Sequence, residues 1–255
     1  ISTYQTDKYW IAEGSKGLRS IQRKGSNSFE ALNEPIILDG PYSNSAFDIV
    51  CKNDKVYMII GGKDLLNGKR FDKGGYILTY DYDKWSFIDP KEAQKKLNLP
   101  RNPRDYTSIA VTTDDSNDEI VYASSMGDGV IQYKNGTPVQ SYNEKNAFKE
   151  TAGGYGSGYC YIDGLAFDKN GNLWMTSSEV NHAVLVLDKA GAWHRLDIEQ
   201  LRGVYTINDI LITSTNDKWI YVPRNTPKLV MIPNSESLDE VSSYEFTTLI
   251  DTDGK

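Results

Sequence analysis

The stretch that most constrains the fold runs from residue 161 to residue 196, where short strand patterns alternate with turn signals. Asn170-Gly171 is the strongest two-residue hairpin signal, because both positions of such a turn favour positive φ. The return strand carries Trp174, and the β-branched run after the next loop is too short for a helix. The predicted strands are residues 162–167, 173–176, 183–187 and 192–196. Four strands joined by tight turns within this length form one propeller blade.

The same pattern recurs along the whole chain. Five units are visible, at approximately residues 1–40, 41–90, 105–145, 159–200 and 204–255. The second strand of each unit carries an aromatic residue, in order Trp10, Tyr57, Tyr122, Trp174 and Trp219. An insertion at 89–106 lengthens one interval, and its residues 92–97 favour a helix between two prolines. We expect the five rings to pack in the core between neighbouring blades.

These units predict an all-β fold, a β-propeller of four-stranded antiparallel blades with about five blade units visible, forming part of a larger ring. We expect residues 1–255 to be a single β-propeller domain or a fragment of one. The inner strand of the first unit is either its first few residues or missing. The chain does not begin with Met or a signal peptide, so we expect an excised or processed piece attached to further blades or domains.

Charge and hydropathy exclude two classes of partner. The 255 residues carry a formal net charge of −7, and no block of Lys or Arg stands out. Nucleic-acid partners need a basic surface, so this charge balance argues against them. The longest apolar runs are about six residues, whereas a membrane-spanning helix needs roughly 18. No membrane span is expected in this chain.

The two cysteines are too few for a disulfide scaffold. Cys51 and Cys160 lie in or beside inner strands of different repeats. We therefore expect two buried free thiols rather than a disulfide.

No motif for catalysis, a metal or a cofactor is present. The chain lacks H-E-x-x-H, C-x-x-C, G-x-S-x-G and Walker sequences. No helix follows the glycine-rich segment 153–158 to bind a phosphate, so this segment is predicted to be a flexible loop. The acidic segment 114–119 lacks the alternation and the glycine of a calcium loop, and it is predicted to be a hairpin tip. We expect no catalytic residue, no metal and no cofactor.

The loop-rich face of the propeller is the predicted binding surface. Loops between second and third strands share this face with the connections that enter each inner strand, so both surround the mouth of the axis. His182 lies in such a loop, and tyrosine recurs just before the inner strands, at positions 42, 106, 159 and 205. Binding usually resides in loops on a rigid scaffold, although these rings could simply cover the blade tops. The ligand-binding candidates are Arg101, Arg104, Asp105, Tyr106, Tyr155, Tyr159, Tyr161, Glu179, Asn181, His182, Tyr205 and Arg224.

The run GLAFDKNGNLWMTS followed by AVLVLD resembles the two-component regulator propeller repeat. Gly17, Gly75 and Gly129 stand where that family has a Gly-Leu step, whereas Ala183 and Lys228 depart from it. The last unit, with its tryptophan strand and extended acidic hairpin, is similar to the propeller of the type IX secretion attachment complex. The resemblance implies export to the periplasm or cell surface, with a role in ligand sensing or in secretion.

The sequence therefore predicts an extracytoplasmic, non-catalytic binding module. Its partner would be a saccharide-like ligand, since Tyr rings stack on sugar rings while Arg and Asp bond the hydroxyls, or a protein. A secretion-complex scaffold fits the same features. A propeller enzyme is a further alternative, because lactonases and streptogramin lyases have similar repeats and use a metal or a catalytic His. Asp48, Asp163 and Asp209, near the starts of inner strands, keep that alternative open.

Overall fold

The computed structural model describes residues 2–5, 7–13, 17–36, 39–65, 67–148, 158–224, 227–235 and 237–247. The chain divides into two compact units, Ile1–Pro41 and Tyr42–Lys255. Each unit has its own sheets. The expectation of a single propeller domain or fragment over residues 1–255 stays a prediction.

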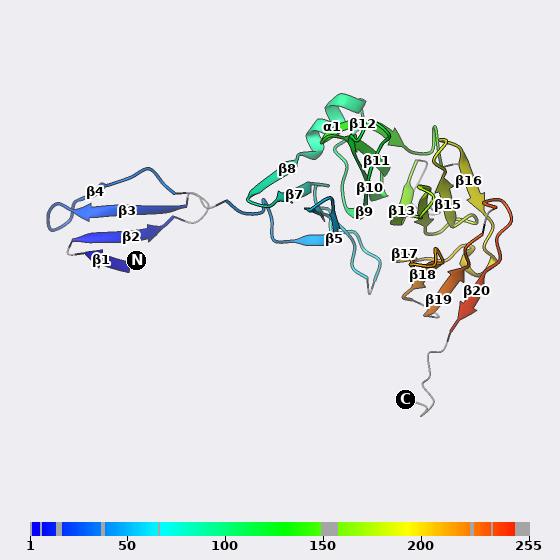
Figure 1. Cartoon of the computed structure of the whole chain (residues 1–255). Coiled ribbons are helices and arrows are strands. Elements are labelled where there is room, and N and C mark those ends of the chain that lie inside the picture. Colours follow the sequence, from blue (N-terminus) through cyan, green and yellow to red (C-terminus); the bar gives the residue numbers. More distant parts are fainter. Residues whose placement is uncertain are drawn as a thin grey trace. The chain divides into compact units, whose positions relative to one another are not determined.

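The first unit is a four-stranded antiparallel sheet in the order β1-β2-β3-β4 (Figure 1). Tyr9 on β2 and Phe29 on β4 pack edge to face, with ring centroids 6.0 Å apart. Its strands are β1 (Ser2–Gln5), β2 (Lys8–Ala12), β3 (Leu18–Arg23) and β4 (Phe29–Ala31). β1 is the inner strand that the sequence pattern left open.

The second unit contains four antiparallel ladders of four strands, which we number blades 2 to 5 after the units of the sequence. Blade 2 comprises β5 (Ala46–Lys52), β6 (Lys55–Ile60), β7 (Ile77–Asp81) and β8 (Lys84–Ile88). Blade 3 comprises β9 (Tyr106–Thr113), β10 (Glu119–Gly127), β11 (Gly129–Lys134) and β12 (Thr137–Tyr142). Blade 4 comprises β13 (Cys160–Phe167), β14 (Leu173–Ser177), β15 (Val184–Leu187) and β16 (Trp193–Leu196). Blade 5 comprises β17 (Ile210–Ile212), β18 (Lys218–Val222), β19 (Lys228–Ile232) and β20 (Tyr244–Phe246).

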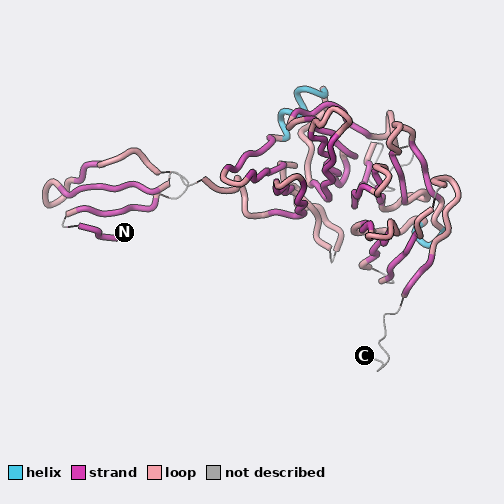
Figure 2. Tube along the Cα trace, in the orientation of Figure 1, coloured by secondary structure: helices cyan, strands magenta, loops and turns pink. Residues whose placement is uncertain are grey.

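The inner strands place the blades around a common axis. β9 contacts both β5 and β13, and β13 in turn contacts β17. β10 continues beyond blade 3 and pairs with β13 at Met126 and Tyr161, which joins blades 3 and 4 into one sheet. Strands and loops make up nearly all of the trace in Figure 2. The predicted all-β propeller fold with four-stranded antiparallel blades is confirmed.

Tight turns connect the strands, although one of them differs from the prediction. Asn53 and Asp54 both have positive φ, 51° and 59°, as the short turn between β5 and β6 requires. Of Asn170 and Gly171, only Gly171 has a positive φ, 85°. In this turn Asp168 Oδ1 instead accepts hydrogen bonds of 2.9 Å from the backbone N–H groups of Asn170 and Asn172. The side chain of Asp168 therefore shapes this hairpin, by the usual Asx-turn chemistry.

The insertion between blades 2 and 3 forms the predicted helix, α1 (Pro90–Leu97). Asp89 caps its first turn by accepting a hydrogen bond from Lys91 N at 2.9 Å, and Asn98 ends it in the left-handed conformation. A short 3₁₀ turn, η2 (Glu199–Leu201), lies between blades 4 and 5. Within the part of the chain that the structure describes, no helix has the length and hydrophobicity needed to cross a membrane.

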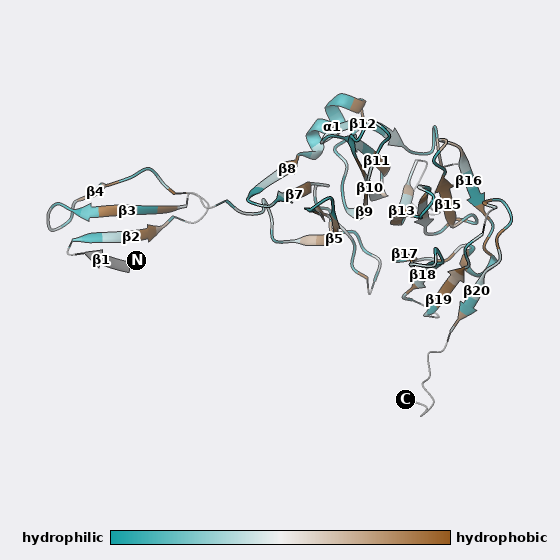
Figure 3. Cartoon of the chain, viewed as in Figure 1, coloured by the Kyte–Doolittle hydropathy of each residue, from teal (hydrophilic) through white to brown (hydrophobic). Residues whose placement is uncertain are grey.

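Blades 3 and 4 pack on their neighbours through both faces, because successive strand residues point to opposite sides. On β14, Leu173 and Met175 join the buried cluster between blades 3 and 4, whereas Trp174 joins the cluster between blades 4 and 5. Tyr57 and Tyr122 likewise each lie between their own blade and the next. The strands β15 and β19 are mostly hydrophobic, and the outermost strands β16 and β20 are largely hydrophilic (Figure 3).

The prediction that the five second-strand rings pack in the core holds less well for Trp10 and Trp219, which are only half-buried. Ile220 of β18 is buried against blade 4. The neighbouring Trp219 therefore lies on the other face of blade 5, where its ring stacks on Phe246 with centroids 5.5 Å apart.

The prediction of two buried thiols is wrong for Cys51. Both cysteines are free, but Cys51 is exposed and only Cys160 is buried. Cys51 shares one face of β5 with Ile49, whose side chain is also exposed, whereas Val50 packs toward blade 3. Burial raises the pKa of the Cys160 thiol to about 12.

Replacing Trp174 by Ala is expected to lower the free energy of unfolding by about 3–5 kcal/mol. The residue is 1% exposed, its Nε1 donates to Asp168 Oδ2 at 2.9 Å, and Lys218 Nζ lies 4.5 Å from its ring centroid. Truncation leaves a cavity between blades 4 and 5 and removes a hydrogen-bond donor. Chemical denaturation measures the loss, and Trp219→Ala, at a half-buried ring, is the control with the smaller effect. A loss below about 1 kcal/mol for Trp174→Ala would contradict this packing.

His194 on β16 is half-buried and lies between two carboxylates. Its Nε2 is 3.1 Å from Asp188 Oδ2, and its Nδ1 is 2.9 Å from Asp239 Oδ1. The hydrogen bonds to Asp239 and to Asp188 raise the pKa of His194 above its ordinary value.

This raised pKa predicts a pH dependence of stability. The folded state binds the His194 proton more tightly than the unfolded state does, so the stabilisation is complete below about pH 6.5 and is lost as pH rises through the folded pKa. Its size should stay below about 1 kcal/mol, because Asp239 is exposed to solvent. Unfolding of the native protein and His194→Gln, compared at about pH 6 and about pH 9, measures the effect. An equal difference between the two proteins at both pH values would disprove it.

Candidate functional site

Loops from several blades meet at one end of the propeller axis. The loop after β6 carries Lys63, which reaches Asp163 on β13 and the carbonyl of Ile207 before β17. The same loop carries Arg70, which contacts Asp105 just before β9. We call this end of the axis the axial mouth. It is defined by Lys63, Arg70, Asp105, Tyr159, Tyr161, Asp163, Glu179, Thr206 and Arg224.

A buried ion pair lies at the base of the axial mouth. Lys63 and Asp163 are 2% and 1% exposed. Lys63 Nζ donates to Asp163 Oδ1 and, at 2.9 Å, to Ile207 O. Ser178 Oγ donates to the second carboxylate oxygen at 2.6 Å. Burial raises the pKa of Asp163 to about 6, and the charge of Lys63 opposes this rise.

The sequence analysis missed Lys63 and considered Asp163 only as a possible metal ligand. The signal for Lys63 was weak: a lysine that follows a buried apolar strand and two glycines. Its ammonium lies 4.9 Å from the ring centroid of Tyr161, which is 2% exposed. Tyr161 therefore supports the lysine from below and presents little ring surface to a ligand.

Asp105 is fully buried, at the point where the loop of blade 2 meets blade 3. Its Oδ2 accepts from Arg70 Nε at 3.1 Å, and its Oδ1 accepts from the backbone N–H of Lys73 at 2.9 Å. Burial raises the pKa of Asp105, while these donors oppose the rise. Asp105 thus anchors the loop that carries Lys63 and Arg70.

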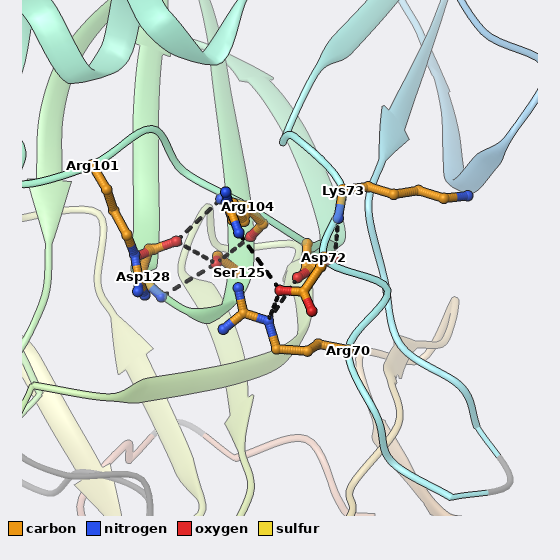
Figure 4. A network of polar contacts seen from close by, with 8 residues as sticks. Arg70, Asp72, Lys73, Arg101, Arg104, Ser125 and Asp128 are labelled. Carbon is orange, nitrogen blue, oxygen red and sulfur yellow. Dashed lines mark hydrogen bonds and ion pairs between the residues drawn. The ribbon is translucent and has the colours of Figure 1, made fainter.

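Arg101 and Arg104 lie on the rim of the axial mouth. Figure 4 shows both beside Asp128, which accepts from Arg101 Nε at 2.8 Å and from Arg104 N at 3.1 Å. The Arg104 guanidinium also lies 3.6 Å from Asp72. Both arginine side chains are 49% exposed, so each keeps donors available to a ligand. Arg101 also lines a cavity of about 360 Å³ together with Tyr159.

Tyr106 lies in the core and not at the mouth. It is 0% exposed, and its hydroxyl is 2.6 Å from that of Tyr133 in the cluster between blades 2 and 3. Its expected role in ligand binding is therefore replaced by a packing role. Tyr155, another candidate, lies outside the described residues.

Three buried polar atoms at the axial mouth have no hydrogen-bond partner among the described residues: Glu179 Oε1, Thr206 Oγ1 and Arg224 Nη1. A methyl group built on Gly68 would lie 3.1 Å from Arg224 Nη1 and 3.4 Å from Thr206 Oγ1, so these two atoms are close together under the loop of blade 2. Glu179 belongs to a segment that hydrogen-bonds the chain beside Thr206, through Glu179 N and Val204 O at 2.8 Å. Buried polar atoms are nearly always paired, so this group marks a position where a bound molecule would supply the partners.

Two of these atoms belong to charged side chains, the Glu179 carboxylate and the Arg224 guanidinium. Burial and the nearby charge of Asp163 raise the pKa of Glu179. The Arg224 guanidinium lies 5.4 Å from the ring centroid of Tyr205, which is 42% exposed. The exposed ring of Tyr205 and the hydrogen-bond donors of Arg224 thus lie side by side.

Asn181 and His182 lie farther out in the same loop of blade 4. Asn181 is exposed and His182 is half-buried. The Arg202 guanidinium, and to a lesser extent His182, lower the pKa of Asp197. His182 therefore lies toward the outer edge of blade 4, where Asp197 follows β16.

The inner-strand carboxylates do not form a metal centre. Asp48 Oδ2 accepts hydrogen bonds from Ile109 N at 3.1 Å and from Ser108 Oγ at 3.2 Å, and Asp163 is held by Lys63. Asp48 and Asp209 border a small cavity of about 130 Å³. Among the described residues, no group of three or more His, Cys, Asp or Glu side chains is placed to hold a metal ion.

Comparisons with known proteins support the fold. No protein-family model and no curated protein matches the sequence. PorZ, an essential surface component of the type IX secretion system of Porphyromonas gingivalis, is 20% identical with a TM-score of 0.72, over 98% of this chain and 33% of PorZ. The allergen Mala s 1 of Malassezia sympodialis is 11% identical with a TM-score of 0.50, over 97% of this chain and 78% of the allergen. The extracellular domain of BT4673 from B. thetaiotaomicron is 17% identical with a TM-score of 0.46, over 89% of this chain and 26% of that one.

The likenesses to PorZ and to Mala s 1 concern the fold and not an activity, because both identities are low. This chain spans about a third of the PorZ chain that it matches. The resemblance of the sequence to the two-component regulator propeller repeat stays a resemblance.

Replacing Lys63 by Met is expected to lower the free energy of unfolding by about 3–5 kcal/mol, because it leaves the Asp163 carboxylate buried without its counter-ion. Chemical denaturation at neutral pH measures the loss. Lys134→Met is the matched control, since Lys134 pairs with Asp114 and Asp118 on the exposed surface and should matter little. Equal losses for the two variants would show that Lys63 does not hold the blades together.

Proposed function

We propose that this chain is an extracytoplasmic, non-catalytic binding module that takes a saccharide-like ligand at the axial mouth. The observation that carries this proposal is the group of buried polar atoms on Glu179, Thr206 and Arg224 that have no hydrogen-bond partner in the part of the chain that the structure describes. Leaving such atoms unpaired costs about 1–3 kcal/mol each, and a ligand that pairs them recovers this cost.

The chemistry of these atoms favours hydroxyl groups. Glu179 offers an acceptor, Arg224 a charged donor, and Thr206 a hydroxyl that can do both. Neighbouring hydroxyls of a sugar ring can satisfy an acceptor and a donor together. The exposed ring of Tyr205 offers an apolar face for the C–H side of the same sugar. The Lys63–Asp163 pair beneath is charge-balanced and adds no net attraction for an ion.

The extracytoplasmic location is supported by the likeness to PorZ, a bacterial surface component of a secretion system. The same likeness favours a second candidate function, a scaffold within such a complex, with a protein in place of the saccharide. In that case the half-exposed Arg101 and Arg104 on the rim would be the first contacts.

A propeller enzyme that uses a metal stays an alternative prediction. It would need the carboxylates of Asp48, Asp163 and Asp209 to turn from their present partners toward a metal ion. Turnover of a lactone or a streptogramin by the purified chain with Mg²⁺ would refute the non-catalytic proposal.

The binding proposal is tested with Arg224→Gln and Glu179→Gln. Binding to an array of neutral glycans selects a saccharide, and titration calorimetry then gives its Kd. Each variant is expected to weaken binding about tenfold or more, which corresponds to about 1.4 kcal/mol. Arg202→Gln is the control, because Arg202 is half-exposed and pairs with Asp197 away from the mouth. Unchanged affinity in both variants, or no saccharide bound, would overturn the proposal.

A further inference from the structure

A groove of about 850 Å³ lies between blades 2 and 3, at the other end of the strands from the axial mouth. β6 begins at this groove with Lys55 and ends near the mouth, where Lys63 follows. The groove is lined by residues of both blades, among them Tyr57, Ile77, Thr79, Ser86, Glu119 and Val121. None of these residues belongs to the axial mouth, so the groove is a separate feature.

The size of the side chains explains why this space stays open. In each blade, a row of paired residues continues outward from the aromatic residue of the second strand and faces the next blade. The rows are Tyr57–Thr79–Ser86 in blade 2, Tyr122–Gln132–Gln140 in blade 3 and Trp174–Val186–His194 in blade 4. Blades diverge from the axis, so the outer members of a row must fill a widening gap. Thr79 and Ser86 have the smallest outer side chains of these rows, and they leave the gap between blades 2 and 3 unfilled.

A fixed carboxylate lies at the base of the groove. Glu119 Oε2 accepts hydrogen bonds from the Tyr57 hydroxyl and, at 3.2 Å, from Lys55 Nζ. Tyr57 is 1% exposed, so its ring cannot move away from this position. Glu119 Oε1 receives no hydrogen bond from the described residues, although the side chain is 22% exposed to the groove. The carboxylate is therefore held in place with one acceptor oxygen unused.

The charges beside this carboxylate disfavour a charged ligand. Lys55 lies between Glu119 and, at 3.7 Å, Asp81, so the three side chains carry a net charge of −1. An anion would be repelled, and an ion of either sign would lose its hydration in the groove. Hydroxyl and amide side chains, including Thr79, Ser86, Asn53 and Asn117, line the upper walls. Ile77 and Val121 add an apolar strip. This combination suits a molecule that is uncharged, donates hydrogen bonds and has an apolar face.

We infer that the groove is a second binding site, for a neutral, hydroxyl-rich molecule of about the size of a disaccharide. Its volume falls within the usual range for small-molecule sites, roughly 300–1,000 Å³. Glu119 Oε1 accepts a hydrogen bond from a ligand hydroxyl, and Thr79 and Ser86 bond neighbouring hydroxyls. The ligand fills the outer part of the gap between blades 2 and 3.

The test uses the full chain, labelled with ¹⁵N, and follows amide shifts during titration. Maltose, lactose and N-acetylglucosamine are the neutral probes, and glucuronate and glucosamine are the charged ones. We expect at least one neutral probe to shift the amides of Thr79, Ser86 and Glu119. Each charged probe should bind at least about tenfold more weakly than that neutral probe. Shifts confined to the residues around Glu179 and Arg224 would place binding at the axial mouth alone and overturn this inference.

Filling the groove provides the matched pair of variants. Ser86 is exposed and its side chain lines the groove, so Ser86→Trp should occupy the space and weaken binding of the neutral probe at least about tenfold while the fold is kept. Ser214→Trp adds the same ring at an exposed turn of blade 5 and should leave binding unchanged. Glu119→Gln keeps the shape but removes the carboxylate, and it should also weaken binding. Full affinity in Ser86→Trp, or binding of no neutral probe by the native chain, would refute the second site.

Discussion

A buried ion pair spans the propeller axis, and the loop-rich end of the second unit is arranged around it. Lys63 comes from a loop of blade 2 and reaches Asp163 in blade 4 and the carbonyl of Ile207 beside blade 5. Either charge alone would be costly to bury, so the pair forms only when these blades are assembled. It thereby fixes the distance across the axis. The Tyr161 ring lies against the lysine, and the charge of Asp163 is close enough to raise the pKa of Glu179.

Packing between adjacent blades is a different kind of contact, and it explains where the second unit can hold a ligand. The inner part of each interface is packed by a cluster of buried hydrophobic side chains, which includes the aromatic residue of the second strand. The row that continues from Tyr57 contains the small Thr79 and Ser86, and a groove of about 850 Å³ remains between blades 2 and 3. The row that continues from Tyr122 contains Gln132, and the cavity between blades 3 and 4 is smaller, about 540 Å³. The interface between blades 2 and 3 thus combines a well-packed inner part, around Tyr57, with an open outer part.

The two candidate sites follow from these two kinds of contact. At the axial mouth, loops from separate blades bring Glu179, Thr206 and Arg224 together, and their buried polar atoms lack partners among the described residues. In the groove, the strands themselves present the polar groups, and Glu119 is fixed by Tyr57 and Lys55. A rigid scaffold with polar groups at defined positions is what ligand recognition requires.

The sequence by itself determined the features that are local or periodic. Strand patterns and turn residues located the blades, and the helix-forming residues between two prolines located α1. The repeated aromatic residue marked Tyr57, Tyr122 and Trp174 as core. It also placed Asp105, Glu179 and Arg224 at the loop-rich end, because alternating strands leave each kind of loop on a fixed side. Only the tertiary structure decided which way individual side chains point. Tyr106 is buried, Cys51 is exposed, and Lys63 crosses the axis. Both faces of a propeller blade can be buried, so strand alternation does not distinguish inside from outside, and that choice depends on contacts between residues far apart in the chain.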